Sequence, residues 1–185
     1  MVISTIKGLT MNTNEILINK FYNCFQNKDF KGMQDCYTDD AHFSDPVFLN
    51  LNAVQVKAMW EMFCVNGKDM QVEFKNVSAN EKTGSAEWMA SYTFSVTGKK
   101  VINRIKANFI IEQGKIVKHI DHFNFYDWCK QALGISGVLL GWTPFVKNKI
   151  RKVAMKNLED FMKRGPLSPG YALPKFWGEK KRSLT

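Results

Sequence analysis

The spacing of hydrophobic positions changes along the chain, from helical near the start to alternating in the middle. From Thr13, which we expect to cap a first helix, apolar residues recur every three or four positions, at Leu17, Phe21, Cys24 and Phe25. Polar residues occupy the positions between them. The pattern predicts an amphipathic helix that packs one face against a core.

Two more helices are predicted before the main strands. A short one runs from about Asp29 to the acidic residues at 39–40, and its apolar residues are Phe30, Met33, Cys36 and Tyr37. The segment 41–48 then alternates and contains Pro46, which confines it to a sheet edge or a strand end. A third helix is predicted over 52–65.

Four strands with alternating apolar residues follow. The inward rows of the first three are Met70, Val72 and Phe74, then Ala86, Trp88, Ala90, Tyr92 and Phe94, then Val101, Ile105, Ala107, Phe109 and Ile111. The fourth strand, 115–125, offers two faces. One face carries Val117, His119, Asp121 and Phe123, and the other carries Ile116, Lys118, Ile120 and His122. Alternation alone does not choose between these faces.

Helices followed by an antiparallel meander predict an α+β fold, with the helices covering one face of a curved sheet. A short helix over 126–133 and a glycine-containing connector over 134–144 come next. Thr143 and Pro144 are suited to open a final helix, at its cap and first position. Its apolar stripe is Val146, Ile150, Val153, Leu158 and Phe161. We therefore expect an unstructured start (1–12), a domain (13–133), a helical extension (134–164) and an irregular basic tail (165–185).

Length and composition favour one domain. The 185 residues are 45% hydrophobic, which is enough for one buried core. No apolar run approaches the roughly 20 residues of a membrane span, and no secretory signal is recognised, so we expect a cytoplasmic protein. The cysteines lack the close pairing of metal or redox sites and are expected to be reduced core thiols; they are Cys24, Cys36, Cys64 and Cys129.

The net charge of +9 arises mainly near the end of the chain. Residues 147–182 contain 11 Lys and Arg against 3 Asp and Glu, a net charge of +8. The preceding body is therefore close to neutral. This distribution argues against a nucleic-acid groove across the domain.

Three groups of residues offer candidate chemistry: the run Phe43-Ser44-Asp45-Pro46, the pair Tyr22 and Tyr37, and the run His119-Ile120-Asp121-His122. Each also has a structural explanation. Asp before Pro tightens turns, and tyrosines or histidines in regular elements are often ordinary core residues. His119 and Asp121 stand two residues apart on a strand, so they project in parallel, about 7 Å apart, into one cavity.

The same residues suggest a family. The stretch Asn27 to Asp45, with YTDDA at 37–41 and FSDPVF at 43–48, resembles the opening of nuclear transport factor 2-like proteins. The run GKIVKHIDHFN at 114–124 is similar to the last strand of SnoaL-like cyclases and limonene-epoxide-hydrolase-like enzymes. The resemblance covers about 13–133. It implies a cone-shaped domain around an apolar pocket, with the last-strand acid Asp121 facing that pocket.

The resemblance to ketosteroid isomerases is incomplete. It places Asp45 where these enzymes keep their general base, and Tyr22, with a one-residue gap, near their oxyanion tyrosine. Their second oxyanion acid aligns with Ala107 or its neighbour Lys106. A full oxyanion hole is therefore not expected, which argues against steroid isomerisation.

The resemblance to epoxide hydrolases is also incomplete. Asp121 matches an acid of their last strand, but their partnered Arg and Asp align with Trp88 and Ala90. Their water-activating constellation is therefore not expected. The fold is better defined by these matches than the reaction.

Two functions remain open. One is a cofactor-independent isomerase, cyclase or hydrolase acting on a small hydrophobic substrate, with Asp121 or Asp45 as base and His119 or Tyr22 as proton donor. The expected pocket residues are Phe43, Trp60, Phe63, Trp88, Tyr92, Ala107, Phe109 and Phe123. The other is a non-catalytic module that binds a hydrophobic ligand or a protein. No phosphate loop or ligand cluster is seen, so neither a cofactor nor a metal is expected.

Two further contacts are expected. The outer face of the sheet carries Ile102, Ile110, Ile116 and Ile120, which predicts a homodimer. The C-terminal helix is expected to pack on the domain through its apolar stripe. Contact of this basic helix with an anionic membrane is the alternative.

Overall fold

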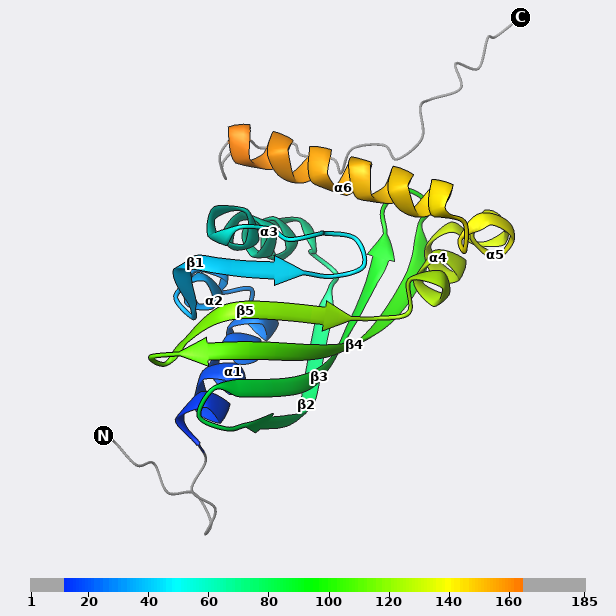
Figure 1. Cartoon of the computed structure of the whole chain (residues 1–185). Coiled ribbons are helices and arrows are strands. Elements are labelled where there is room, and N and C mark those ends of the chain that lie inside the picture. The colour runs from blue at the N-terminus through cyan, green and yellow to red at the C-terminus, as the bar shows by residue number, and fades with distance from the viewer. Residues whose placement is uncertain (1–11, 165–185) are drawn as a thin grey trace, which may run out of the picture.

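The computed structural model describes residues 12–164 as a five-stranded sheet with helices at one face and at one end (Figure 1). The helices are α1 (Thr13–Gln26), α2 (Phe30–Gln34), α3 (Ala53–Asn66), α4 (Phe125–Leu133), α5 (Ile135–Leu140) and α6 (Pro144–Arg164). The strands are β1 (Tyr37–Ser44), β2 (Gln71–Ala79), β3 (Thr83–Phe94), β4 (Lys99–Glu112) and β5 (Lys115–His122). The predicted α+β class is confirmed. The expectations for 1–11 and 165–185 lie outside the described residues.

Side-chain caps define where the first helices begin. Asn12, rather than Thr13, caps α1, and it forms a capping box with Glu15. Asp29 caps α2 as predicted, with its carboxylate accepting from the N–H of Gly32. The predicted extension of α2 through Tyr37 is wrong, because the chain turns after Gln34 and Tyr37 begins β1.

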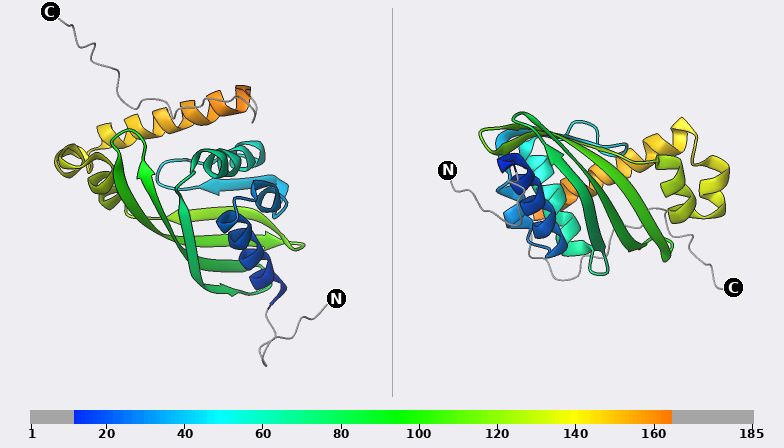
Figure 2. Two further views of the ribbon diagram at one scale, coloured as in Figure 1. Left: turned by 180° about the vertical axis from the view of Figure 1, so that it is seen from behind. Right: turned by 90° about the horizontal axis from the view of Figure 1, so that it is seen from below.

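The sheet is mixed, with strand order β1-β5-β4-β3-β2. Strands β2 to β5 pair antiparallel as expected, but β1 pairs parallel with β5, with Phe43 opposite His119. The expectation of a wholly antiparallel sheet is therefore wrong at this edge. The sheet curves and twists, and α1 and α3 lie against its inner side (Figure 2).

Burial confirms the alternation predicted for β4, in which Val101, Ile105, Ala107, Phe109 and Ile111 are buried. Strand β5 differs at its start. The pairing with β4 shifts register between Ile110 and Ile111, and Ile116 is fully buried. The expectation that Ile116 lies on the outer face is therefore wrong.

The outer face of the sheet retains exposed isoleucines. Ile102 and Ile110 are both well exposed, and Ile120 is half-buried. These are three of the four isoleucines that suggested a homodimer. The homodimer itself stays a prediction.

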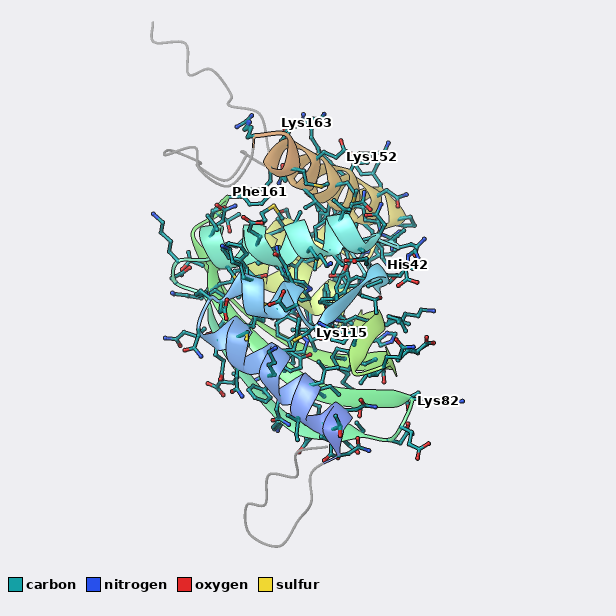
Figure 3. The ribbon with its side chains drawn as sticks, turned by 90° about the vertical axis from the view of Figure 1, so that its left-hand side faces the viewer. His42, Lys82, Lys115, Lys152, Phe161 and Lys163 are labelled. Atoms are coloured by element: carbon teal, nitrogen blue, oxygen red, sulfur yellow. The ribbon has the colours of Figure 1, made fainter. Side chains whose placement is uncertain are left out.

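Helix α6 runs along α3 and packs on it (Figure 1). Its buried residues are Val146, Ile150, Leu158 and Phe161, and Val153 is half-buried. Figure 3 shows Phe161 on the side toward α3, with Lys152 and Lys163 on the outer side. The apolar stripe is thus a core face and the lysines are solvated. Among the described helices, none combines the length and apolar character needed to cross a membrane.

The packing of α6 should contribute to stability. Leu158 is fully buried in the main core, so Leu158→Ala is expected to lower the free energy of unfolding by about 2–4 kcal/mol. Met162→Ala, on an exposed position of the same helix, is the control and should change it by less than about 0.5 kcal/mol. Urea unfolding followed by circular dichroism measures both. Equal, small effects would contradict the packing described here.

Candidate functional site

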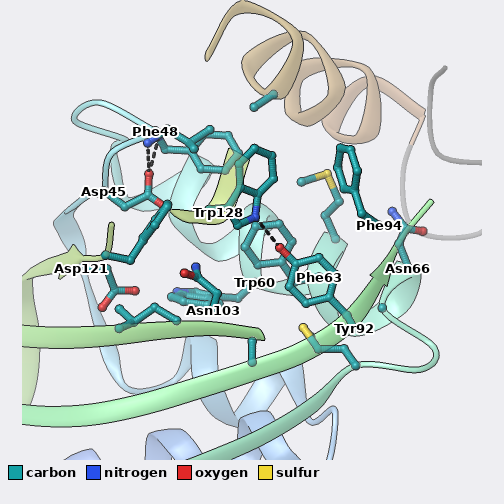
Figure 4. A pocket seen from close by; sticks show the side chains of 18 of the residues that line it. Asp45, Phe48, Trp60, Phe63, Asn66, Tyr92, Phe94, Asn103, Asp121 and Trp128 are labelled. Carbon is teal, nitrogen blue, oxygen red and sulfur yellow. Dashed lines mark hydrogen bonds between the residues drawn. The ribbon is translucent and has the colours of Figure 1, made fainter. Parts of the chain in front are cut away.

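A cavity of about 270 Å³ lies between the inner side of the sheet and helices α3, α4 and α6 (Figure 4). Its walls are mainly apolar. The aromatic lining residues are Phe25, Phe43, Phe48, Trp60, Phe63, Trp88, Tyr92, Phe94, Phe123 and Trp128. Three carboxylates line this space: Asp45, Asp69 and Asp121. Asp45 and Asp121 lie at one end of the cavity, and Asn66 lies at the other (Figure 4). Asp69 is exposed and pairs with Lys100.

Asp45 follows the end of β1, at the turn that begins with Pro46. One of its carboxylate oxygens accepts hydrogen bonds from the backbone N–H groups of Val47 (2.7 Å) and Phe48 (2.5 Å). Burial nevertheless raises the pKa of Asp45 to about 7. The negative charge of Asp121 raises this pKa further, whereas the two N–H groups and Arg151 lower it. Asp45 can therefore hold or release a proton near neutral pH.

Asp121 is buried on β5 and is held by two donors. His119 Nε2 lies 3.0 Å and Trp88 Nε1 lies 3.2 Å from the same oxygen, Oδ1. The second oxygen, Oδ2, accepts no hydrogen bond from any residue between 12 and 164. Since Asp121 lines the cavity, Oδ2 is the oxygen available to a ligand.

The hydrogen bonds behind Asp121 form a chain with a defined direction. Trp60 Nε1 donates to the hydroxyl of Tyr37 (2.9 Å), and that hydroxyl lies 2.6 Å from His119 Nδ1. Because indole N–H only donates, the Tyr37 oxygen accepts from Trp60 and its own hydrogen is free for His119. With Nδ1 as the acceptor from Tyr37, the Nε2–H of His119 is the group that donates to Asp121. The tautomer follows from this count of donors and acceptors.

The structure brings most of the predicted site residues together around the cavity. Those that line it are Asp45, Asp121, Phe43, Trp60, Phe63, Trp88, Tyr92 and Phe123. Four others do not line it: His119, Tyr22, Ala107 and Phe109 are buried in the wall behind. His119 therefore contacts the acid rather than the cavity.

Tyr22 occupies a different environment from the one its predicted role requires. Its ring stacks on Phe74, with centroids 5.2 Å apart, and its hydroxyl is buried without a hydrogen-bond partner among the described residues. Burial raises the pKa of Tyr22 well above its ordinary value. The hydroxyl thus stays protonated inside the core.

Several lining residues were missing from the predicted site. Helix α6 contributes Ile150, Ala154 and Asn157, although it lies beyond the stretch that resembled a family. Trp128 of α4 also lines the cavity and donates to the hydroxyl of Tyr92 at 2.8 Å. Asn66 lines it too, with a side-chain nitrogen that is buried and unpaired within the described part of the chain. The apolar stripe of α6 indicated that one face of the helix is buried, but it did not show that this face covers the cavity.

Metal binding has no geometric support in the described part of the chain. Within residues 12–164, no three His, Cys, Asp or Glu side chains are grouped so that they could hold an ion.

Comparison with protein families gives a match to the SnoaL-like domain over residues 18–119, more than half of the chain. A comparison with curated protein sequences gives no match.

Comparison with solved structures supports the same fold. An epoxide hydrolase of the limonene-epoxide-hydrolase-like type from M. tuberculosis is 19% identical and aligns with a TM-score of 0.54 over 69% of this chain and 96% of its own. IdmH, a proposed polyketide cyclase from Streptomyces antibioticus, is 16% identical, with a TM-score of 0.57 over 67% and 100%. A nuclear transport factor 2-like protein of unknown function from Burkholderia pseudomallei is 14% identical, with a TM-score of 0.57 over 66% and 98%. At these identities the likeness concerns the fold.

The raised pKa of Asp45 should make stability depend on pH. Folding favours its protonated form, so the parent loses stability as pH rises from about 4, the unfolded value, to about 7. Asp45→Asn removes this loss. The difference in free energy of unfolding, variant minus parent, should therefore be about 2–4 kcal/mol larger at about pH 8 than at about pH 4. Urea unfolding at both pH values measures it.

The control for this comparison is Asp40→Asn, at an exposed position on β1. Its stability difference from the parent should change by less than about 0.5 kcal/mol over the same pH range. If the stability difference between Asp45→Asn and the parent depended on pH as little as that of the control, Asp45 would titrate as an ordinary carboxyl.

The two buried tyrosines should respond oppositely to loss of their hydroxyls. Tyr22→Phe removes an unpaired buried hydroxyl, so the free energy of unfolding should stay the same or rise by about 1 kcal/mol. Tyr37→Phe leaves Trp60 and His119 without their partner and should lower it by about 1–3 kcal/mol. Thermal and urea unfolding compare the pair. A larger loss for Tyr22→Phe would overturn these assignments.

Proposed function

The chain belongs to the SnoaL-like domain family, and we propose that it is a cofactor-independent enzyme that moves a proton within a small hydrophobic carbonyl compound. The observation that carries this proposal is the pair of carboxylates, Asp45 and Asp121, at one end of a cavity whose walls are mainly apolar. Paired acids in unlike environments are suited to act as acid and base in one reaction.

Asp121 is the general base in this proposal. Its Oδ1 is held by His119 and Trp88, which leaves Oδ2 free toward the cavity. A carboxylate fixed in this way can remove a proton from a carbon next to a carbonyl group. The carbon–hydrogen bond breaks, its electron pair forms the enol double bond, and the proton goes to Oδ2.

Asp45 is the general acid. With a pKa of about 7, a large share of Asp45 is protonated at neutral pH and can donate to the carbonyl oxygen as it becomes negative. Return of the proton from Asp121 to another carbon, while the enol O–H proton goes back to Asp45 and the carbonyl re-forms, completes an isomerisation. Attack of the enol carbon on a second carbonyl of the same substrate would instead close a ring, with the new alkoxide taking the proton from Asp121 and the enol O–H proton returning to Asp45.

The aromatic walls define the class of substrate. A cavity of about 270 Å³ with few polar groups favours a small, mainly apolar molecule over a sugar or nucleotide. The same walls partly shield Asp45 from water, and this desolvation is the main cause of its raised pKa. Binding and acid–base chemistry therefore depend on the same surface.

His119 and Tyr37 are positioning residues. The bond from Tyr37 leaves the Nε2 proton of His119 directed at Asp121, and this orients the carboxylate. Because His119 does not line the cavity, it acts through Asp121 rather than on the substrate.

The proposal is tested by hydrogen–deuterium exchange of an apolar cyclic ketone such as β-tetralone. We expect the protein to accelerate exchange of the protons next to the carbonyl in deuterium oxide, followed by NMR. Asp121→Asn should lower the rate at least about 100-fold. In the parent, the rate should fall as pH rises through about 7, because Asp45 loses its proton, and Asp45→Asn should lack this inflection.

His122→Ala is the matched control, since His122 is exposed and adjacent to Asp121 on the same strand. It should retain the parent rate within about twofold. Equal losses in both variants would overturn the assignment of the inward face. If calorimetry shows that the ketone binds but the protein does not accelerate exchange of its protons, the protein is the non-catalytic hydrophobic-ligand module instead.

A further inference from the structure

The corner formed by α4, α5 and the start of α6 exposes an unusual concentration of large apolar side chains. We call it the α5 patch. Its residues are Ile135, Val138, Leu139, Leu140, Trp142 and Phe145, with exposed fractions from 47% to 80%. The corner projects at one end of the molecule, beyond the strands (Figures 1 and 2). Patches of this kind on a folded protein mark contact sites.

Close packing of two glycines explains why these side chains point outward. A Cβ at Gly137 would collide with the backbone carbonyl of Cys129 on α4, and one at Gly141 would lie 2.6 Å from the Cys129 Cβ. Only residues without a side chain fit this inner face of α5. The larger apolar residues between and beside the glycines are therefore directed to solvent.

The patch is also held in place. Tyr126 of α4 donates from its hydroxyl to the carbonyl of Val138 at 2.9 Å, and Trp142 Nε1 donates to the carbonyl of Leu139 at 3.1 Å. The first bond ties α5 to α4, and the second holds the Trp142 side chain against the last turn of α5.

Positive charge predominates around the patch. Residues 127–158 contain six Lys and Arg and one acidic residue, Asp127, which pairs with Lys130. Lys99 approaches the start of α5, since a Cβ at Gly134 would lie 3.3 Å from its Nζ, and Lys147 lies over the ring of Phe125 at 5.5 Å. Neither lysine has an acidic partner within residues 12–164. The patch therefore combines exposed apolar side chains with free positive charge.

We propose that the α5 patch binds an anionic phospholipid membrane, with its apolar side chains at the headgroup boundary and the nearby lysines on the lipid phosphates. Apolar burial and attraction to anionic lipids together produce this mode of binding. Two patches of like charge repel, which disfavours a second copy of the chain as the occupant. At six residues, α5 inserts shallowly and does not span the bilayer. The proposal is independent of the function proposed for the cavity.

Co-sedimentation of the full chain with vesicles tests this proposal. We expect binding to vesicles that contain phosphatidylglycerol, and much weaker binding to phosphatidylcholine alone. Leu139→Gln with Phe145→Gln should weaken binding at least about tenfold. Lys99→Gln with Lys147→Gln should also weaken it and reduce its sensitivity to salt.

The matched control replaces two similarly exposed apolar residues elsewhere, Leu49→Gln with Val54→Gln, and should bind as the parent does. Circular dichroism verifies that each variant is folded. Absence of vesicle binding by the parent, or equal binding by the Leu139/Phe145 variant, would overturn the proposal. Light scattering provides a further check: a parent dimer that this variant abolishes, without any vesicle binding, would assign the patch to a second copy.

Discussion

The arrangement of the whole site depends on the burial of one carboxylate, Asp121, in an aromatic wall. A buried carboxylate without donors would cost several kcal/mol, because it loses its hydration. His119 and Trp88 supply those donors, and His119 is directed in turn by Tyr37 and Trp60. The chain of hydrogen bonds links β3, β5, β1 and α3. Correct placement of the acid therefore requires these four elements to be in register.

Alternation predicted the strands well where one face is buried throughout. Strand β4 is the clearest example, since its pairing with β3 is regular and its inward residues are apolar except for Asn103, which lines the cavity. The burial of Ile116 was not predicted, because it follows from a register shift in the pairing of β4 with β5. The alternation of apolar and polar residues along one strand does not reveal such a shift. Tyr37 was assigned to a helix for a related reason. Local spacing could not show that β1 pairs with β5, which follows it by about 70 residues.

The acidic residues of the candidate site could be predicted from the sequence, but the arrangement of the side chains around them could be predicted only in part. Two residues on one strand face, His119 and Asp121, do lie together, as a period of two requires. Sequence alone could not tell which of them reaches the cavity, because that depends on side chains from other elements. Trp88 was expected only as a wall residue, yet it also donates to Asp121. The indole N–H makes this second role possible, but only the fold brings it within reach.

Helix α6 links the cavity to the far end of the molecule. Its Ile150 and Ala154 line the cavity, and Arg151 donates from Nε to the carbonyl of Pro46 at 3.0 Å. Arg151 thus stands beside Asp45, where its positive charge lowers a pKa that burial raises. Loss of this contact would favour the protonated acid, while opening of the wall would admit water and favour the carboxylate. The acid strength of Asp45 is therefore set jointly by the domain and its C-terminal helix, and the site is incomplete without that helix.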